Sequence, residues 1–146
     1  MINITVNDGW NLIGLPVIVS DSHYQSVFLN SVLGTLYGYD EVYMEQELLI
    51  NGNGYWLRFS DDAVVIIEGS ELNTLSITLS ESWNLISGIS QGIDVDDIDD
   101  PDDIVISGTY YSFGETYTSA STLEPGKGYW VKANSVGIIS LTFSGF

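Results

Sequence analysis

One stretch of sequence occurs twice and decides the fold: GNGYWLR at residues 52–58 and GKGYWVK at residues 126–132. A second motif, WNLI, occurs at residues 10–13 and again at residues 83–86. Two further pairs lie between these motifs in the same order: GTLY (34–37) with GTYY (108–111), and EVY (41–43) with ETY (115–117). Matches in one order at a nearly constant offset of 73 or 74 residues indicate an internal duplication. We therefore predict two repeats, residues 1–74 and 75–146, packed as one compact unit with approximate two-fold symmetry.

The hydrophobic pattern predicts strands throughout both repeats. Residues 2–6 and 75–79 alternate apolar and polar side chains, which is typical of half-buried strands. Short runs rich in aromatic and β-branched residues follow, separated by turn residues, at the spacing of sandwiches and barrels. They are residues 10–19, 32–39, 54–59, 63–67, 83–89, 104–113, 128–133 and 137–143. We expect an all-β fold, a sandwich or barrel-like structure with little helix.

Local signals refine this prediction at three kinds of position. Residues 24–33 are the best helix candidate, with Asp21 or Ser22 as the N-cap. Hairpin turns are expected at residues 61–62 and 134–135, between strands that would pair with each other. The Gly-x-Gly pairs at residues 52–54 and 126–128 are expected to supply positive φ in turns before the Tyr-Trp pairs.

The charge balance excludes several classes of function. The chain of 146 residues has 20 acidic residues against 3 basic ones, Arg58, Lys127 and Lys132, which gives a net charge of −17. A nucleic-acid binder needs a basic face, so we expect no nucleic-acid partner. No apolar stretch approaches the roughly 18 residues of a spanning helix, so we expect no membrane insertion.

The residue types that most often carry catalysis are scarce. Cysteine is absent and His23 is the single histidine, which leaves few residues for acid–base or thiol chemistry. We expect no enzymatic activity.

Taken together, the two motifs resemble a known kind of bacterial module. WNLI followed by LxPGKGYWVK is similar to repeats in large secreted surface proteins of Bacteroidetes-type bacteria, often near a type IX secretion sorting domain. The second repeat carries the fuller match, at residues 82–87 and 123–132. The first repeat departs from it, with Asn51 in place of proline and Asn53 in place of lysine. The resemblance implies a non-catalytic accessory module, located outside the cell or on its surface, within a larger protein or assembly.

An acidic run is the most unusual local feature. Its candidate metal ligands are Asp94, Asp96, Asp97, Asp99 and Asp100, and Asp102 and Asp103 follow. Calcium takes six to eight oxygen ligands, which a carboxylate-rich loop supplies. The EF-hand pattern is not met, because an isoleucine and then an aspartate stand where an oxygen ligand and a glycine are required. The alternatives are a calcium site, with no cofactor otherwise required, and a solvated acidic loop.

The aromatic residues are the second candidate site. Rings beside polar side chains suit sugar binding, by stacking and hydrogen bonding. The candidates for a ligand-binding surface are Tyr37, Tyr39, Tyr111 and Tyr117; Tyr43, Tyr110 and Phe113 are also expected near the surface. Trp10 and Trp83 begin the most apolar strands and are expected in the core. The alternative for most of these rings is core packing, with Arg58 and Lys132 covering an aromatic face or offsetting local acidic charge.

Two functions follow from these observations. The first is a structural or adhesive surface module that associates with itself through exposed strand edges, with divalent cations bridging its acidic surface. The second is a carbohydrate-binding module that uses exposed aromatic side chains to bind a surface glycan. A hydrolase is a third possibility, supported by no identifiable catalytic pair. The string Gly-x-Ser-x-Gly at residues 88–92 is treated as chance, because the only histidine precedes it and no helix is expected after it.

Overall fold

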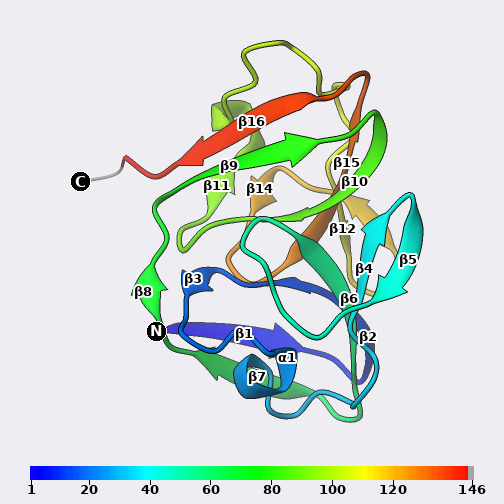
Figure 1. The fold of residues 1–146 in the computed structure, drawn as a ribbon, viewed down its shortest axis with the longest axis vertical. Coiled ribbons are helices and arrows are strands. Elements are labelled where there is room, and N and C mark those ends of the chain that lie inside the picture. The colour runs from blue at the N-terminus through cyan, green and yellow to red at the C-terminus, as the bar shows by residue number, and fades with distance from the viewer. Residues whose placement is uncertain (145–146) are drawn as a thin grey trace.

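The computed structural model describes residues 1–144 and confirms an all-β fold (Figure 1). Strands hold 51% of the residues and helices 5%. The strands of the first half are β1 (Ile2–Val6), β2 (Gly9–Gly14), β3 (Val17–Ile18), β4 (Tyr37–Asp40), β5 (Val42–Glu45), β6 (Gly54–Phe59), β7 (Ala63–Ile67) and β8 (Ser70–Glu71). Those of the second half are β9 (Thr74–Leu79), β10 (Ser82–Ser87), β11 (Ile93–Asp94), β12 (Tyr111–Phe113), β13 (Tyr117–Ser119), β14 (Thr122–Leu123), β15 (Gly128–Ala133) and β16 (Gly137–Thr142). The helical turns are α1 (Tyr24–Val27) and a 3₁₀ turn (Val95–Asp97).

Each half is organised around a bent two-stranded ribbon. In the first half, β1 pairs with β7, and after the bend β2 pairs with β6, both antiparallel. In the second half, β9 pairs with β16 and β10 with β15 in the same way. The turns after β6 and β15 therefore join different sheets, and the prediction of hairpins at residues 61–62 and 134–135 is wrong. The strands on either side of each turn pair with β1 and β2, or with β9 and β10, and not with each other.

The asparagine of the WNLI motif holds the bend. Asn11 Oδ1 accepts a hydrogen bond from Asn7 N (3.0 Å), and Asn11 Nδ2 donates to Asn7 O (2.8 Å). Asn84 makes the corresponding pair of bonds with the backbone of Ser80, both 2.9 Å. A side-chain amide can satisfy a donor and an acceptor of the corner at once. The motif thus fixes the angle between the two parts of each ribbon.

Each half contains a four-stranded sheet, which includes the strand pair after the bend, β2–β6 or β10–β15. Its strand order is β2-β6-β4-β5 in the first half and β10-β15-β12-β13 in the second. Tyr37 lies opposite Trp56 in one sheet, and Tyr111 lies opposite Trp130 in the other. The two halves therefore share a strand order, while an overall two-fold symmetry stays a prediction. The two sheets meet where β10 contacts β2, β4 and β6 and where β15 contacts β2 and β6.

Each half has its own hydrophobic core. One cluster gathers buried side chains from Ile4 to Ile67, and the other gathers buried side chains from Leu72 to Leu141. A third, smaller cluster joins them and consists of Leu12, Leu85 and Trp130. We call the contact around this third cluster the seam. Packing across the seam holds the two cores in one unit.

The seam depends on close backbone approach, which the glycines allow. Gly14 N donates to Gly126 O (3.2 Å), and Ser87 N donates to Gly52 O (2.9 Å). Gly52 and Gly126 have φ values of +90° and +82°, as predicted for the Gly-x-Gly turns. Their partners Gly54 and Gly128 have no positive φ and are needed for space. A Cβ on Gly54 would lie 2.6 Å from the Ile86 carbonyl oxygen.

Several predicted boundaries shift in the structure. The helix predicted at residues 24–33 is the single turn α1, and its N-cap is His23, whose Nδ1 accepts from Gln25 N (3.2 Å). The strands predicted at residues 32–39 and 104–113 shrink to their last few residues, as β4 and β12. Turns around Gly34 and Gly108, with φ of +77° and +78°, occupy the remainder. Positive φ at these glycines ends the extended conformation there.

Candidate functional site

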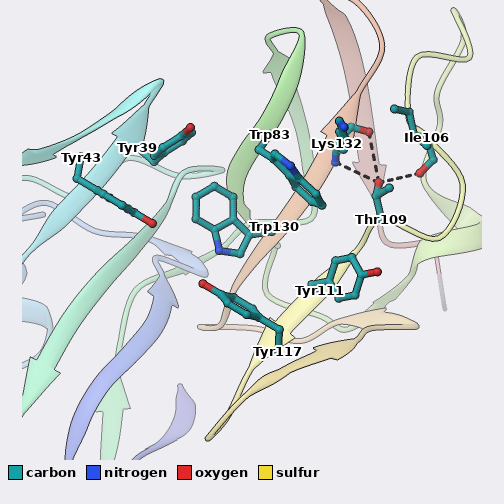
Figure 2. A pocket seen from close by; sticks show the side chains of 9 residues that line it. All are labelled: Tyr39, Tyr43, Trp83, Ile106, Thr109, Tyr111, Tyr117, Trp130 and Lys132. Atoms are coloured by element: carbon teal, nitrogen blue, oxygen red, sulfur yellow. Dashed lines mark hydrogen bonds between the residues drawn. The ribbon is translucent and has the colours of Figure 1, made fainter.

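Aromatic side chains from both halves surround a hollow of about 690 Å³, which we call the first hollow (Figure 2). It is open to solvent and lined by Tyr39, Tyr43, Trp83, Ile106, Thr109, Tyr111, Tyr117, Trp130 and Lys132. This volume lies within the range of about 300–1,000 Å³ found for small-molecule sites. The ring-rich lining and a few polar groups give it the composition of a ligand pocket.

Strand alternation places the second-half side chains on one face. Trp130 and Lys132 are two residues apart in β15, so they point to the same side, while Val131 points into the core and is fully buried. Trp83 lies opposite Lys132 in the neighbouring strand, and Tyr111 lies opposite Trp130 on the other side. With Tyr117 of β13, the sheet β10-β15-β12-β13 therefore presents five of the lining residues as one surface.

The first half closes the other side of the hollow. Tyr39 from β4 packs edge-on against Trp130, with ring centroids 4.9 Å apart and an interplanar angle of 78°. Tyr43 from β5 packs against Tyr39 at 5.3 Å and is 53% exposed. In Figure 2 the hydroxyl ends of Tyr43 and Tyr117 point toward the Trp130 indole. The hollow thus spans the seam and requires both halves.

The first hollow contains an indole N–H donor, that of Trp130, and one ammonium group, that of Lys132. The indole Nε1 of Trp130 is buried and has no hydrogen-bond partner. A buried donor without an acceptor is costly, and a ligand oxygen that reached it when neighbouring rings moved aside would relieve that cost. The Lys132 ammonium lies 5.8 Å from the centre of the Trp83 ring, so this lysine covers an aromatic face as predicted. Thr109 holds the rim in place, donating to Ile106 O (2.7 Å) and accepting from Lys132 N (3.1 Å).

A second hollow of about 550 Å³ lies on the same aromatic surface. It is lined by Trp10, Tyr37, Tyr43, Trp56 and Phe113. Phe113 packs against Trp56 with centroids 4.9 Å apart at 77°, which matches the Tyr39–Trp130 contact of the first hollow. Tyr43 lines both hollows, so they form one continuous surface, which we call the aromatic face. The second hollow has phenylalanine where the first has tyrosine.

The predicted ligand-binding tyrosines are brought together on the aromatic face. Tyr39, Tyr111 and Tyr117 line the first hollow and Tyr37 lines the second. The prediction that Trp10 and Trp83 belong to the core is wrong, since they are 44% and 37% exposed. They lie at the outer corner of each ribbon, where the chain has just turned and side chains still face solvent.

Other residues of the site were missed by sequence reasoning. Trp130 was not singled out, although Lys132 two positions later shows that this face of the strand reaches solvent. Tyr110 was expected near the surface and is buried instead, 8% exposed. Burial, reinforced by the charge of Asp100, raises the pKa of Tyr110 to about 12.

The acidic run forms a loop whose carboxylates partly serve the backbone. Asp94 caps the 3₁₀ turn by accepting from Asp96 N (2.9 Å). Asp100 accepts from Ile104 N and from Val105 N, both at 3.0 Å. Within residues 1–144, no three acidic or histidine side chains converge as metal ligands, those of Asp97 and Asp99 included. Calcium binding by this loop stays a prediction.

The Gly-x-Ser-x-Gly string has a structural role. Ser90 is buried, and its hydroxyl accepts from Leu72 N (2.8 Å) and donates to Pro16 O (2.7 Å). These bonds tie the second half to the segment between β2 and β3.

Lys127 also links the two halves: its ammonium donates a hydrogen bond to Thr5 O, and burial lowers the pKa of this ammonium.

Comparison with known protein families, with curated proteins and with solved structures finds no match. The resemblance to secreted surface modules therefore stays a prediction. Among the helices of residues 1–144, none is long and apolar enough to cross a membrane.

Proposed function

We propose that the protein is a non-catalytic binding module whose aromatic face binds a neutral carbohydrate chain. The observation that carries this proposal is the first hollow, where Trp83 and Tyr117 offer exposed ring surface around the unpartnered Trp130 indole N–H. Sugar rings present apolar C–H faces and hydroxyl edges. Such a ligand matches a site that supplies aromatic faces together with a few hydrogen-bonding groups.

The charge of the chain selects among sugars. With a net charge of −17, the protein repels uronates and sulfated chains at low salt. Lys132 is the one cation among the residues that line the first hollow, and it already lies over Trp83. Neutral hexose or pentose polymers are therefore the expected ligands.

Binding to a surface glycan would serve the adhesive role suggested by the sequence. The extracellular location, the larger parent protein and the structural role are part of this proposal and rest on the sequence resemblance. The proposed adhesive role requires only that the module bind the glycan, so the proposal includes no catalytic step.

Affinity electrophoresis in gels containing neutral polysaccharides tests the proposal. The panel should include hydroxyethylcellulose, xyloglucan, xylan, laminarin and mannan, with polygalacturonate as the anionic comparison. We expect at least one neutral polymer to slow migration and polygalacturonate to leave it unchanged. Migration that is unaffected by every neutral polymer at 1% (w/v) would overturn the proposal.

Two matched variants locate the site. Trp83→Ala removes an exposed ring from the first hollow, and Trp10→Ala removes its counterpart from the second. Both side chains are partly exposed, so both variants should keep the fold. We expect Trp83→Ala to weaken binding by roughly tenfold, about 1.4 kcal/mol, and Trp10→Ala to weaken it less, since the second hollow lacks the indole donor. Unchanged binding in both variants would exclude the aromatic face.

A further inference from the structure

The outer edge of β16 is covered by another part of the chain. Asp99 N donates to Ser140 O (3.0 Å), and Ser140 N donates to Asp99 O (2.9 Å), as in an antiparallel strand pair. Neighbouring Ile98 packs against the second core. The segment around Asp99 thus forms a single β-bridge with β16, on the side away from β9.

The corresponding edge of β7 is open. Ile66 lies opposite Asn3 in the β1–β7 ribbon, just as Ser140 lies opposite Ser76 in the β9–β16 ribbon. Within residues 1–144, no backbone group pairs with Ile66 outside its own ribbon. The side chains of Val64 and Ile66 are 61% and 57% exposed. An unpaired edge next to exposed aliphatic side chains is a template for another strand.

A hollow of about 630 Å³ lies beside this edge. Its lining includes Ile18, Val19, Val27, Ile66, Ile67 and Glu68. Ser26 and Val27 of α1 also line this hollow, and no backbone hydrogen bond joins α1 to β7 among the described residues. The hollow can take an aliphatic side chain, as the second core takes Ile98.

We propose that the outer edge of β7 binds an extended segment of a partner polypeptide, which adds as an antiparallel strand beside Ile66. The partner segment places an aliphatic side chain in the hollow and is neutral or basic around it. Its charge follows from the acidic groups that flank the edge, Asp21 and Glu68 in the hollow and Asp62 before β7. The same groups and the net charge of −17 disfavour a second copy of this chain as the occupant. This mode of recognition takes its affinity from main-chain hydrogen bonds and its specificity from side-chain pockets.

A labelled peptide tests the proposal by fluorescence anisotropy. The peptide copies residues 95–101, VDDIDDP, with its four aspartates replaced by lysine, and a scrambled peptide of the same composition is the control. We expect saturable binding of the lysine peptide in 0.15 M salt, and binding at least tenfold weaker for the scrambled peptide and for the original acidic sequence. Equal binding of the lysine and scrambled peptides, or no saturation at millimolar protein, would overturn the proposal.

Variants of the protein separate the edge from general charge attraction. Ile66→Pro removes the edge N–H, and we expect at least a tenfold loss of peptide binding. Ile18→Ser removes apolar lining from the hollow and should also weaken peptide binding. It provides a second test if Ile66→Pro does not fold. Ile138→Ser, which changes a similarly exposed residue (50%) on the other ribbon, should leave binding unchanged. Binding that survives both Ile66→Pro and Ile18→Ser would contradict the assignment.

The competing occupant has its own signature. Concentration-dependent dimers in sedimentation velocity that disappear in Ile66→Pro, without peptide binding, would mean that a second copy covers β7 and would overturn the choice of a foreign segment. No sugar is present in these experiments. Their outcome is therefore independent of the proposed carbohydrate binding.

Discussion

Substitution of Gly14 by alanine tests the seam, because the structure leaves no room for a side chain there. A Cβ on Gly14 would lie 2.0 Å from Ser87 Cβ and 2.4 Å from Ser87 Oγ. The strands cannot separate freely, since Gly14 N is bonded to Gly126 O and Ser87 N to Gly52 O. Overpacking of this kind costs about 1–3 kcal/mol or more. In a chain of this size, that corresponds to a fall in Tm of roughly 3–10 °C.

Two further variants make the prediction specific. Gly114→Ala is the control, because a Cβ there meets no atom within 4 Å and its φ is not positive. The double variant Gly14→Ala/Ser87→Gly moves the Cβ from one side of the seam to the other and relieves the clash. It loses the hydrogen bond from Ser87 Oγ to Asn53 O (2.8 Å), which contributes about 0.5–1.5 kcal/mol.

Urea unfolding followed by tryptophan fluorescence and far-ultraviolet circular dichroism measures these effects. We expect Gly14→Ala to be clearly less stable than Gly114→Ala, and Gly14→Ala to destabilise the Ser87→Gly background less than it destabilises the parent. If Gly14→Ala matched the control, or if it cost as much in the Ser87→Gly background as in the parent, the described packing of the seam would be refuted.

Three further predictions concern stability. Ser82 has a φ of +84° at the corner where the first half has Gly9 (φ +99°), so Ser82→Gly should raise the free energy of unfolding by about 0.5–1 kcal/mol in urea titrations, and a loss would contradict the strain at this corner. The pKa of Tyr110 is raised from 10.0 to about 12. The stability that the neutral Tyr110 hydroxyl contributes to the folded state is therefore fully present below pH 10 and is lost as the pH rises through about 12. Tyr110→Phe should therefore lose less stability than the parent between pH 9.5 and 11.5, and parallel curves would contradict this. The net charge of −17 predicts a Tm that rises from 0.05 to 0.5 M sodium chloride, as repulsion is screened, and calorimetry showing a flat or falling Tm would refute it.

The strand content and the positions of the motifs could be predicted from the sequence because they depend on local pattern. Alternation at residues 2–6 and 75–79 and turn residues between short apolar runs were sufficient for the all-β class. The pairing of strands could not be predicted in the same way. The bend at Asn11 and Asn84 sends consecutive strands into different sheets, and it depends on side-chain bonds to residues four positions earlier.

The aromatic site was predicted only in part, for a physical reason. Tyr37, Tyr39, Tyr111 and Tyr117 were predicted to bind a ligand because rings beside polar side chains suit sugars, and all four line the aromatic face. Trp83 was assigned to the core because it precedes an apolar run, whereas its position after the bend leaves it partly in solvent. The contact of Tyr39 with Trp130 of the other half depends on the seam, which no local pattern encodes.

The most direct test of carbohydrate binding is the indole N–H region of a ¹⁵N-correlation spectrum, where the four tryptophans give four signals. The titrant is a soluble oligosaccharide of the polysaccharide that retards the protein most in affinity electrophoresis. The Trp130 signal is identified as the one missing from the spectrum of Trp130→Phe. We predict that the Trp130 and Trp83 signals shift saturably and that the Trp130 proton moves downfield as its unpartnered N–H gains an acceptor. If all four indole signals stayed unchanged at millimolar sugar, the aromatic face would not be a carbohydrate-binding site.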